Sequence, residues 1–271
     1  MAKKFTKELI VKPGEKVRLS KYDADETLGW HKGNKMDASL ADAIQRIDNL
    51  QYRLGAERKR ALLIVLQGLD TAGKDGTIRH VMTGMNPQTC KVTSFKVPSE
   101  EEMAHDFLWR VHKAVPAHGE VGIFNRSHYE DVLVVRVHKL VPKEVWSARY
   151  DEINRFESIL AANGVRILKF FLHISKDEQH KRLMQRIDDP DRQWKISEAD
   201  FHERKFWNDY TDAYEHALAK CSTDDAPWFI IPSNKKWFRN LAVSHVIAET
   251  LEDMNPKFPP PTVDVSKIKF S

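Results

Sequence analysis

Cysteine is scarce in this sequence, and two features of secreted and membrane proteins are missing from it. The 271 residues include only Cys90 and Cys221, which lie far apart and form no metal-binding or redox motif. No run of 18 or more apolar residues occurs, so we expect no membrane-spanning helix and no membrane partner. The opening stretch, MAKKFTKELIVKPGEK, has no apolar segment typical of a signal peptide. These absences predict a cytoplasmic protein with reduced cysteines.

A strong excess of charge of either sign is absent as well. The formal net charge of +4 permits a polyanionic partner without indicating one, and we expect no nucleic-acid partner. Hydrophobic residues make up 41% and charged residues 30%, an ordinary globular mixture. Without an internal repeat or linker, residues 1–271 are predicted to form a single domain, with a polar arm outside the core at 1–35 and an extended, proline-rich tail at 255–271.

Apolar runs of strand length alternate with helical patterns along the chain. The predicted strands cover residues 61–67, 90–95, 120–125, 165–175 and 227–232, and the run at 61–67 is nearly continuously apolar. Helical periodicity is found at 36–60, 74–84, 128–139, 142–163, 198–220 and 235–254, after a capping box formed by Ser99 and Glu102, and in a segment that ends near Asp188. Such alternation predicts a three-layer α/β/α fold with a parallel five-stranded sheet.

The first strand is followed by a glycine-rich loop. Residues 68–74, GLDTAGK, fit the phosphate-loop pattern G-x-x-x-x-G-K, between a buried strand and a helix. Glycines let backbone N–H groups point at phosphate oxygens, and the helix dipole favours an anion there. The alternative is a turn with an incidental glycine and lysine. The predicted phosphate-binding residues of the loop and the helix start are Gly68, Ala72, Gly73, Lys74, Asp75, Gly76 and Thr77.

The loop departs from the pattern at the position after its lysine. A serine or threonine would hold Mg²⁺ there, but this sequence has Asp75. Carboxylates are ligands that Mg²⁺ prefers, and an acid beside phosphate is stabilised by a cation between them. We therefore assign the metal role to Asp70, and interpret Asp75 as an acid favoured in the first helical turn.

A second polar cluster, FNRSHYED, follows the third predicted strand. Ligands bind at the carboxyl ends of parallel strands, so Asn125 and Arg126 are expected beside the phosphate loop, where Arg126 could bind a transferring phosphoryl group. Glu130 or Asp131 could supply a carboxylate linked to the metal. The alternative is that Ser127 and Glu130 form a capping box; both roles are compatible.

A third cluster lies in residues 180–206, interpreted as a helical lid. Arg182 and Arg186 are four residues apart and share a helix face, and Lys195 follows in a polar connection. Arginines in such lids stabilise the charge of a transferring phosphoryl group. The alternative is a solvated helix with paired charges.

Five stretches in consistent order resemble the polyphosphate kinase 2 family. They are GLDTAGKDGT, SFKVPSEEEMAHDFLWR, FNRSHYEDV, KRLMQRIDDPDRQWK and APWFIIP, and the resemblance covers residues 35–255. It implies a thymidylate-kinase-like fold and transfer of a phosphoryl group, reversibly, between inorganic polyphosphate and a nucleotide. It also implies Mg²⁺ or Mn²⁺ as cofactor, and assembly into a homodimer or homotetramer.

The resemblance also implies roles for individual residues. Asp70 is similar to the metal-linked aspartate of the family, and Lys74 to its phosphate-binding lysine. Arg126, Arg182 and Arg186 resemble its phosphate-binding arginines. The reading Tyr-Glu-Asp at 129–131 resembles the subgroup that accepts both AMP and ADP, with GMP and GDP as further candidates. Two alternatives are an ATP-dependent nucleoside-monophosphate kinase and a nucleotide-binding switch without transfer activity.

Overall fold

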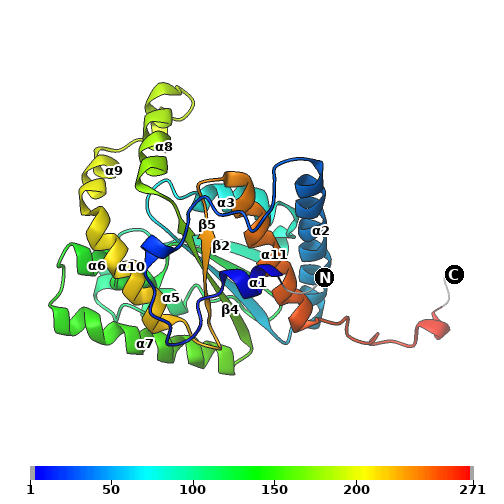
Figure 1. Ribbon diagram of the computed structural model, residues 1–271. Helices are drawn as coiled ribbons and strands as arrows, with labels where there is room; N and C mark the ends of the chain where they lie inside the picture. The colour runs from blue at the N-terminus through cyan, green and yellow to red at the C-terminus, as the bar shows by residue number, and fades with distance from the viewer. Residues whose placement is uncertain (1–3, 269–271) are drawn as a thin grey trace.

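A five-stranded, all-parallel sheet forms the centre of the computed structural model, which describes residues 4–268 (Figure 1). Its spatial order is β2-β3-β1-β4-β5. The strands are β1 (Ala61–Gln67), β2 (Cys90–Ser94), β3 (Val121–Asn125), β4 (Val165–His173) and β5 (Trp228–Pro232). The predicted parallel five-stranded sheet is confirmed, because each strand lies within a segment predicted as a strand.

Helices cover both faces of this sheet (Figure 1). The helices packed on one face are α1 (Lys4–Leu9), α2 (Asn34–Glu57), α3 (Lys74–Val81) and α11 (Lys236–Met254). The helices on the other face include α6 (Val134–Val137), α7 (Lys143–Ala162) and α10 (Trp207–Cys221). Within residues 4–268, no helix has the length and apolar character needed to cross a membrane.

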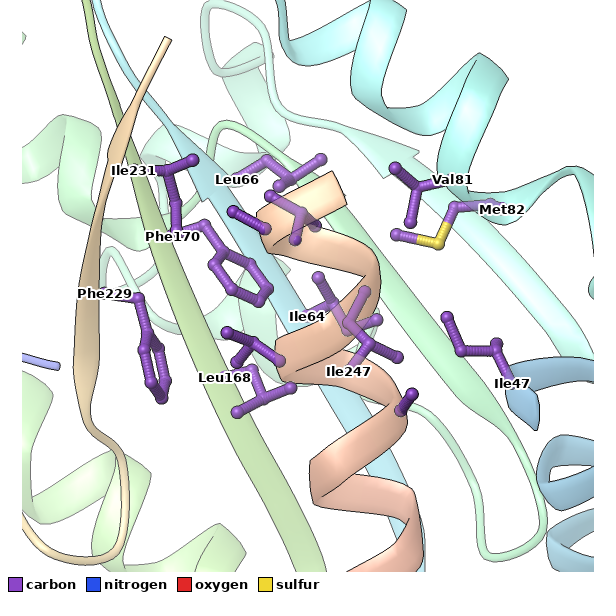
Figure 2. Packing of buried hydrophobic residues seen from close by; sticks show 14 of the residues in the cluster. Ile47, Ile64, Leu66, Val81, Met82, Leu168, Phe170, Phe229, Ile231 and Ile247 are labelled. Atoms are coloured by element: carbon purple, nitrogen blue, oxygen red, sulfur yellow. The ribbon is translucent and has the colours of Figure 1, made fainter. Parts of the chain in front are cut away.

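The central strand β1 explains how two cores form on the two faces. All its residues are buried, and successive side chains point to opposite faces. Leu62, Ile64 and Leu66 join the cluster under α11, whereas Leu63 and Val65 join the one under α7 and α10. Figure 2 shows the first cluster, where side chains of β1, β4 and β5 meet α11. A continuous apolar run is therefore required in β1.

The N-terminal arm differs from the expectation of a segment outside the core. Phe5 and Leu9 of α1 are buried in the cluster under α11, and Val11 is buried on the other face. Ile10 forms an antiparallel bridge with Phe229, and the Val11 N–H donates to the Trp228 carbonyl at 2.8 Å. The apolar residues of the arm therefore cover the edge of β5, despite the polar average of residues 1–35.

The helix after Ser99 is shorter than its periodicity predicts. The capping box is present, with Ser99 and Glu102 bonded reciprocally, but α4 (Glu100–Met103) ends after one turn. The Asp106 carboxylate accepts a hydrogen bond from the Leu108 N–H at 3.0 Å, and a second short helix, α5 (Trp109–His112), follows. An aspartate that bonds nearby backbone competes with helix continuation, which accounts for the break.

The segment predicted as a lid projects from the body as α8 (Lys176–Asp188) and α9 (Glu198–Glu203) (Figure 1). The Ser175 hydroxyl caps α8 by accepting from the Glu178 N–H at 3.1 Å. Helix α8 ends at Asp188, two residues before Pro190, because the residue that precedes a proline disfavours helical backbone. The base of α8 thus begins at the carboxyl end of β4.

The core cluster under α11 predicts a difference between two isoleucines. We expect Ile247→Ala, fully buried in α11, to lower the free energy of unfolding by about 2–5 kcal/mol because it leaves a cavity. Ile159→Ala is the matched control, since Ile159 in α7 is 58% exposed and should change it by about 0.5 kcal/mol or less. Urea denaturation measures both, and equal effects would contradict the assigned core.

Candidate functional site

The glycine-rich loop lies at the centre of the carboxyl edge of the sheet. Residues 68–73 connect β1 to α3, and β1 has β3 on one side and β4 on the other. The chain leaves β1 for the far edge strand β2 and returns through β3, so β1 is at the point where the strand order reverses. Crevices at such reversal points are where open parallel sheets bind ligands.

The backbone of the loop requires glycine at Gly68 and Gly73. Their φ angles are +156° and +108°, in a region that residues with a Cβ rarely adopt. A Cβ at Gly68 would lie 2.9 Å from the Leu172 carbonyl oxygen, and one at Gly73 would overlap the Arg239 guanidinium. Close packing behind the loop therefore adds a steric reason for these glycines.

Helix α3 holds the two ends of the loop. The Lys74 ammonium donates to the Gly68 carbonyl at 2.7 Å, so its side chain folds back across the loop. The Thr77 hydroxyl and N–H both donate to the Gly73 carbonyl, at 3.1 and 2.9 Å. These bonds direct the carbonyls of Gly68 and Gly73 toward the first turn of α3.

Helix α8 holds the middle of the loop. Gln179 donates from its amide to the Asp70 carbonyl at 3.2 Å. Arg182 donates from Nη1 to the Thr71 carbonyl at 2.9 Å and to the Ala72 carbonyl at 3.2 Å. Because a peptide N–H and C=O point in opposite directions, holding the Asp70 and Ala72 carbonyls leaves the Thr71 and Gly73 N–H groups directed away from α8, as anion binding requires. The Ala72 N–H is used within the loop, where it donates to the Leu69 carbonyl at 3.0 Å.

The position of Arg182 differs from the prediction that it contacts phosphate. Its side chain is 5% exposed, and its N–H groups all have protein acceptors. Nε donates to Glu178 at 2.7 Å, and Nη2 donates to the carbonyls of Ser233 and Asn234 at 2.6 and 2.9 Å. A guanidinium has five N–H donors, so in this structure Arg182 supports the loop instead of facing a ligand.

Arg239 of α11 is a second buried support that no sequence pattern revealed. Nη1 contacts the Ala72 carbonyl at 3.4 Å, while Nε and Nη2 donate to the Asn240 amide oxygen at 3.1 and 2.8 Å. Burial and the neighbouring Arg182 lower the pKa of Arg239 to about 10, so it is a cation at neutral pH. Two positive charges therefore lie behind the loop.

An acidic and basic cluster lies in front of the loop. Arg126 donates from Nη2 to Asp70 at 3.0 Å and from Nη1 to Glu130 at 3.4 Å. Burial favours the neutral form, but Glu130 and Asp70 outweigh it and raise the pKa of Arg126. At 41% exposure of its side chain, Arg126 is accessible to a ligand. The Asn125 amide donates to Asp75 at 2.8 Å, which joins the end of β3 to the start of α3.

Lys74 has an unusual pKa in this setting. Burial of its ammonium lowers the pKa to about 8, and the positive charge of Arg126 lowers it as well. Asp70, Glu130 and Asp75 act in the opposite direction without cancelling this effect. A lysine whose charge is disfavoured until an anion arrives is typical of a functional site.

Three predicted residues lie outside this cluster. Asp131 pairs with Arg149 at 3.0 Å instead of facing Asp70, and burial raises its pKa despite that partner. Arg186 donates to the Lys195 carbonyl at 3.4 Å, and the Lys195 ammonium lies 4.9 Å from the Trp194 ring. Arg186 and Lys195 thus meet on the projecting segment.

The loop and the two strand ends contain the remaining predicted residues. Those brought together at this edge are Gly68, Asp70, Ala72, Gly73, Lys74, Asp75, Gly76, Thr77, Asn125, Arg126 and Glu130. Sequence reasoning missed Gln179 and Arg239. Gln179 is three residues before Arg182 on α8, and that helical spacing was the one signal that could have indicated it.

Comparison with known proteins gives consistent results over nearly the whole chain. The family model described as polyphosphate kinase 2 (PPK2) matches residues 30–259. An AMP/ADP-polyphosphate phosphotransferase from Meiothermus ruber is 50% identical over 97% of this chain and 98% of its own. An ADP-polyphosphate phosphotransferase from Rhodopseudomonas palustris is 46% identical over 95% and 93%. The crystal structure of polyphosphate kinase 2 from Arthrobacter aurescens TC1 superposes with a TM-score of 0.92 at 44% identity, covering 97% of this chain and 94% of that one.

The pKa of Lys74 predicts that anion binding weakens in alkaline solution. Lys74 is charged below pH 8 and neutral above it, so a bound polyanion must recruit a proton there. We expect the Kd for tripolyphosphate, measured by calorimetry, to rise about tenfold per pH unit above 8. Lys74→Arg stays charged and is the control, since its curve contains only the ionisation of the anion and of other groups. Parallel curves for the two proteins would contradict this assignment.

Proposed function

Because the chain belongs to the polyphosphate kinase 2 family, we propose that it transfers a phosphoryl group reversibly between inorganic polyphosphate and the adenine nucleotides AMP and ADP. The observation that carries this conclusion is the glycine-rich loop, supported by donors from α3 and α8 at the reversal point of the sheet, with Lys74 and the accessible Arg126 beside it. The enzyme is a polyphosphate-dependent nucleotide kinase.

The reaction we propose is an in-line displacement. A terminal phosphate oxygen of the nucleotide forms a bond to the end phosphorus of polyphosphate. The bond from that phosphorus to the bridging oxygen breaks, and the bridging oxygen leaves with the shortened polyphosphate chain. The protein contributes orientation and charge, because little covalent chemistry is needed. The loop N–H groups and Lys74 hold the donor end. Arg126 stabilises the oxygens of the phosphoryl group in transit through its fixed fork.

A divalent ion fits the residues at the loop. Asp70 and Glu130 both contact Arg126 and supply carboxylate oxygens. Among the side chains of residues 4–198 and 201–268, no three or more from His, Cys, Asp or Glu are grouped so that they could hold a metal alone. The ion would therefore need phosphate and water oxygens as well, which is how Mg²⁺ is commonly bound. We assign Mg²⁺ or Mn²⁺ to Asp70, with Glu130 in support; when bound, it would neutralise phosphate oxygens.

Asp131 is a weaker metal candidate than the sequence alone indicated, because Arg149 occupies its carboxylate at 3.0 Å. We propose that Arg182 supports the loop. Arg186 and Lys195 lie on the projecting segment, and we propose that they contact phosphate from there. Guanine nucleotides, a homodimer or homotetramer, and a cytoplasmic location stay predictions. The name of the Meiothermus ruber relative supports acceptance of both AMP and ADP.

Nucleotide phosphorylation without a nucleoside triphosphate is the direct test of this function. We expect ³¹P NMR to show ATP forming from ADP, and ADP from AMP, with polyphosphate and Mg²⁺ as the only additions. Formation of product only when a nucleoside triphosphate is the donor would instead identify a nucleoside-monophosphate kinase.

Lys74→Ala should lower kcat by roughly two to three decades, because it removes a charge that acts on the reacting phosphates. Circular dichroism checks its fold, and wild-type turnover by the folded variant would exclude the assigned role.

The two aspartates allow a matched test of the metal assignment. Asp70→Asn should lower kcat by roughly two decades and raise the Mg²⁺ concentration needed for half-maximal rate. Asp131→Asn should leave that Mg²⁺ concentration within a factor of about three, because the Asp131 carboxylate is engaged by Arg149. A titration of rate against Mg²⁺ distinguishes them, and the opposite order of effects would move the metal to Asp131.

A further inference from the structure

A lysine lies fully buried in the middle of the sheet. Lys169 is in β4, where its neighbours are Val65 of β1 and Trp228 of β5, and its face of the sheet packs under α7 and α10. Its ammonium donates to the Glu157 carboxylate at 2.5 Å and to the Cys221 carbonyl at 2.6 Å. The proposed transfer reaction leaves Lys169 without an explanation, although a charge in such a place is costly to bury.

The partner of Lys169 is equally buried. Glu157 of α7 is 1% exposed, and burial acts to raise its pKa, but Lys169 and His128 outweigh that effect and lower it. Glu157 is therefore a carboxylate at neutral pH. Apolar side chains of similar volume often replace a buried ion pair without loss of stability, so packing alone does not account for it.

The ion pair is bonded to the segment that follows β3. Glu157 Oε1 is hydrogen-bonded to His128 Nε2 at 3.1 Å and accepts from the Tyr129 hydroxyl at 3.0 Å. Lys169 donates to the same hydroxyl at 2.8 Å. His128 and Tyr129 are buried, and they lie between Arg126 and Glu130 in the chain. One buried network thus holds the inner side of the segment whose outer side carries the accessible arginine.

Arg126 needs such an anchor because its backbone is strained. Its φ is +63°, in the left-handed region that is unfavourable for a residue with a Cβ. Strained residues persist where the surroundings determine their conformation. On the side of β1, Gln67 donates to the Ser127 hydroxyl at 3.2 Å. On the side of α7, the bonds to Glu157 fix the next two residues.

We propose that Glu157 and Lys169 are positioning residues for phosphoryl transfer, which hold the segment 126–130 so that Arg126 and Glu130 face the phosphate loop. The proposal rests on the proposed function for the reaction that it supports. Neither residue touches a ligand: they act through His128 and Tyr129. Removing the pair should therefore lower kcat without weakening ground-state binding.

The deciding variant replaces both charges by apolar groups of similar size, Glu157→Leu with Lys169→Met. We expect it to fold, with kcat lowered at least tenfold and the KM values for polyphosphate and ADP within about threefold of wild type. Amide hydrogen exchange should become faster in residues 126–130 and stay unchanged in β1 and α11. The control is Arg46→Met with Glu252→Leu, which removes an ion pair between α2 and α11 at 2.7 Å and should keep wild-type kcat.

A second variant keeps the proposal testable if the double variant does not fold. Tyr129→Phe removes one hydroxyl and leaves the ion pair in place, so it should fold, lower kcat at least threefold and accelerate exchange in residues 126–130. Unchanged kcat and unchanged exchange in a folded variant would overturn the positioning role. A loss confined to KM would also overturn it. Failure of wild type to use polyphosphate would instead reject the proposed function, and the exchange measurement would still report on the anchor.

Discussion

The backbone carbonyls of the phosphate loop are held by donors, and the rest of the site depends on this constraint. Each carbonyl from Gly68 to Gly73 accepts a hydrogen bond, from the loop itself, α3, α8 or α11. A loop has no ladder of its own, so these bonds replace the partners that a helix or strand would supply. Since peptide N–H groups point away from their carbonyls, the supports determine the side on which an anion is received. Helices distant in sequence therefore jointly determine the shape of a seven-residue motif.

Charge is distributed around the loop in two layers. Arg182 and Arg239 lie behind it and are almost fully buried; Arg182 is bonded to the Glu178 carboxylate, whereas Arg239 donates to the Asn240 amide oxygen. Lys74 and Arg126 lie in front, among carboxylates that a divalent ion or a phosphate chain would engage. Because Arg182 and Arg239 are buried, their charges stay behind the loop whether or not a ligand is bound. They therefore give a permanent positive potential of the kind that favours anions. The front charges can exchange partners, which suits groups that act on a reacting phosphate.

The sequence predicted the strands and the phosphate loop better than the buried side chains that support them. Apolar runs located β1, β4 and β5 because a strand buried on both faces must be apolar nearly throughout, and the G-x-x-x-x-G-K pattern placed Lys74 where the loop meets α3. Arg182 was assigned to phosphate from its helical spacing and Asp131 to the metal from its position after the third strand, but neither signal reveals the carbonyls around Arg182 or the partner Arg149. Arg239 and Lys169 match no motif, because the Ala72 carbonyl that Arg239 contacts, and the Tyr129 hydroxyl and Cys221 carbonyl that Lys169 contacts, lie at least 40 positions away in the sequence. The arm was misjudged because its buried apolar residues, among them Phe5, Leu9 and Val11, are diluted by polar neighbours.

Helix α8 belongs to two parts of the molecule, and this has a mechanical consequence. Its first two turns are fixed to the loop and to the end of β5 through Gln179 and Arg182, whereas its last turn extends into the projecting segment with Arg186 (Figure 1). If α8 and the rest of the projecting segment rotated as one rigid body about the end of β4, the hydrogen bonds from Gln179 and Arg182 to the loop carbonyls would be strained or broken. A motion that keeps these bonds must instead hinge after Arg182, so only the last part of α8 can move with the projecting segment. The first two turns of α8 then belong structurally to the site, as a fixed support of the phosphate loop.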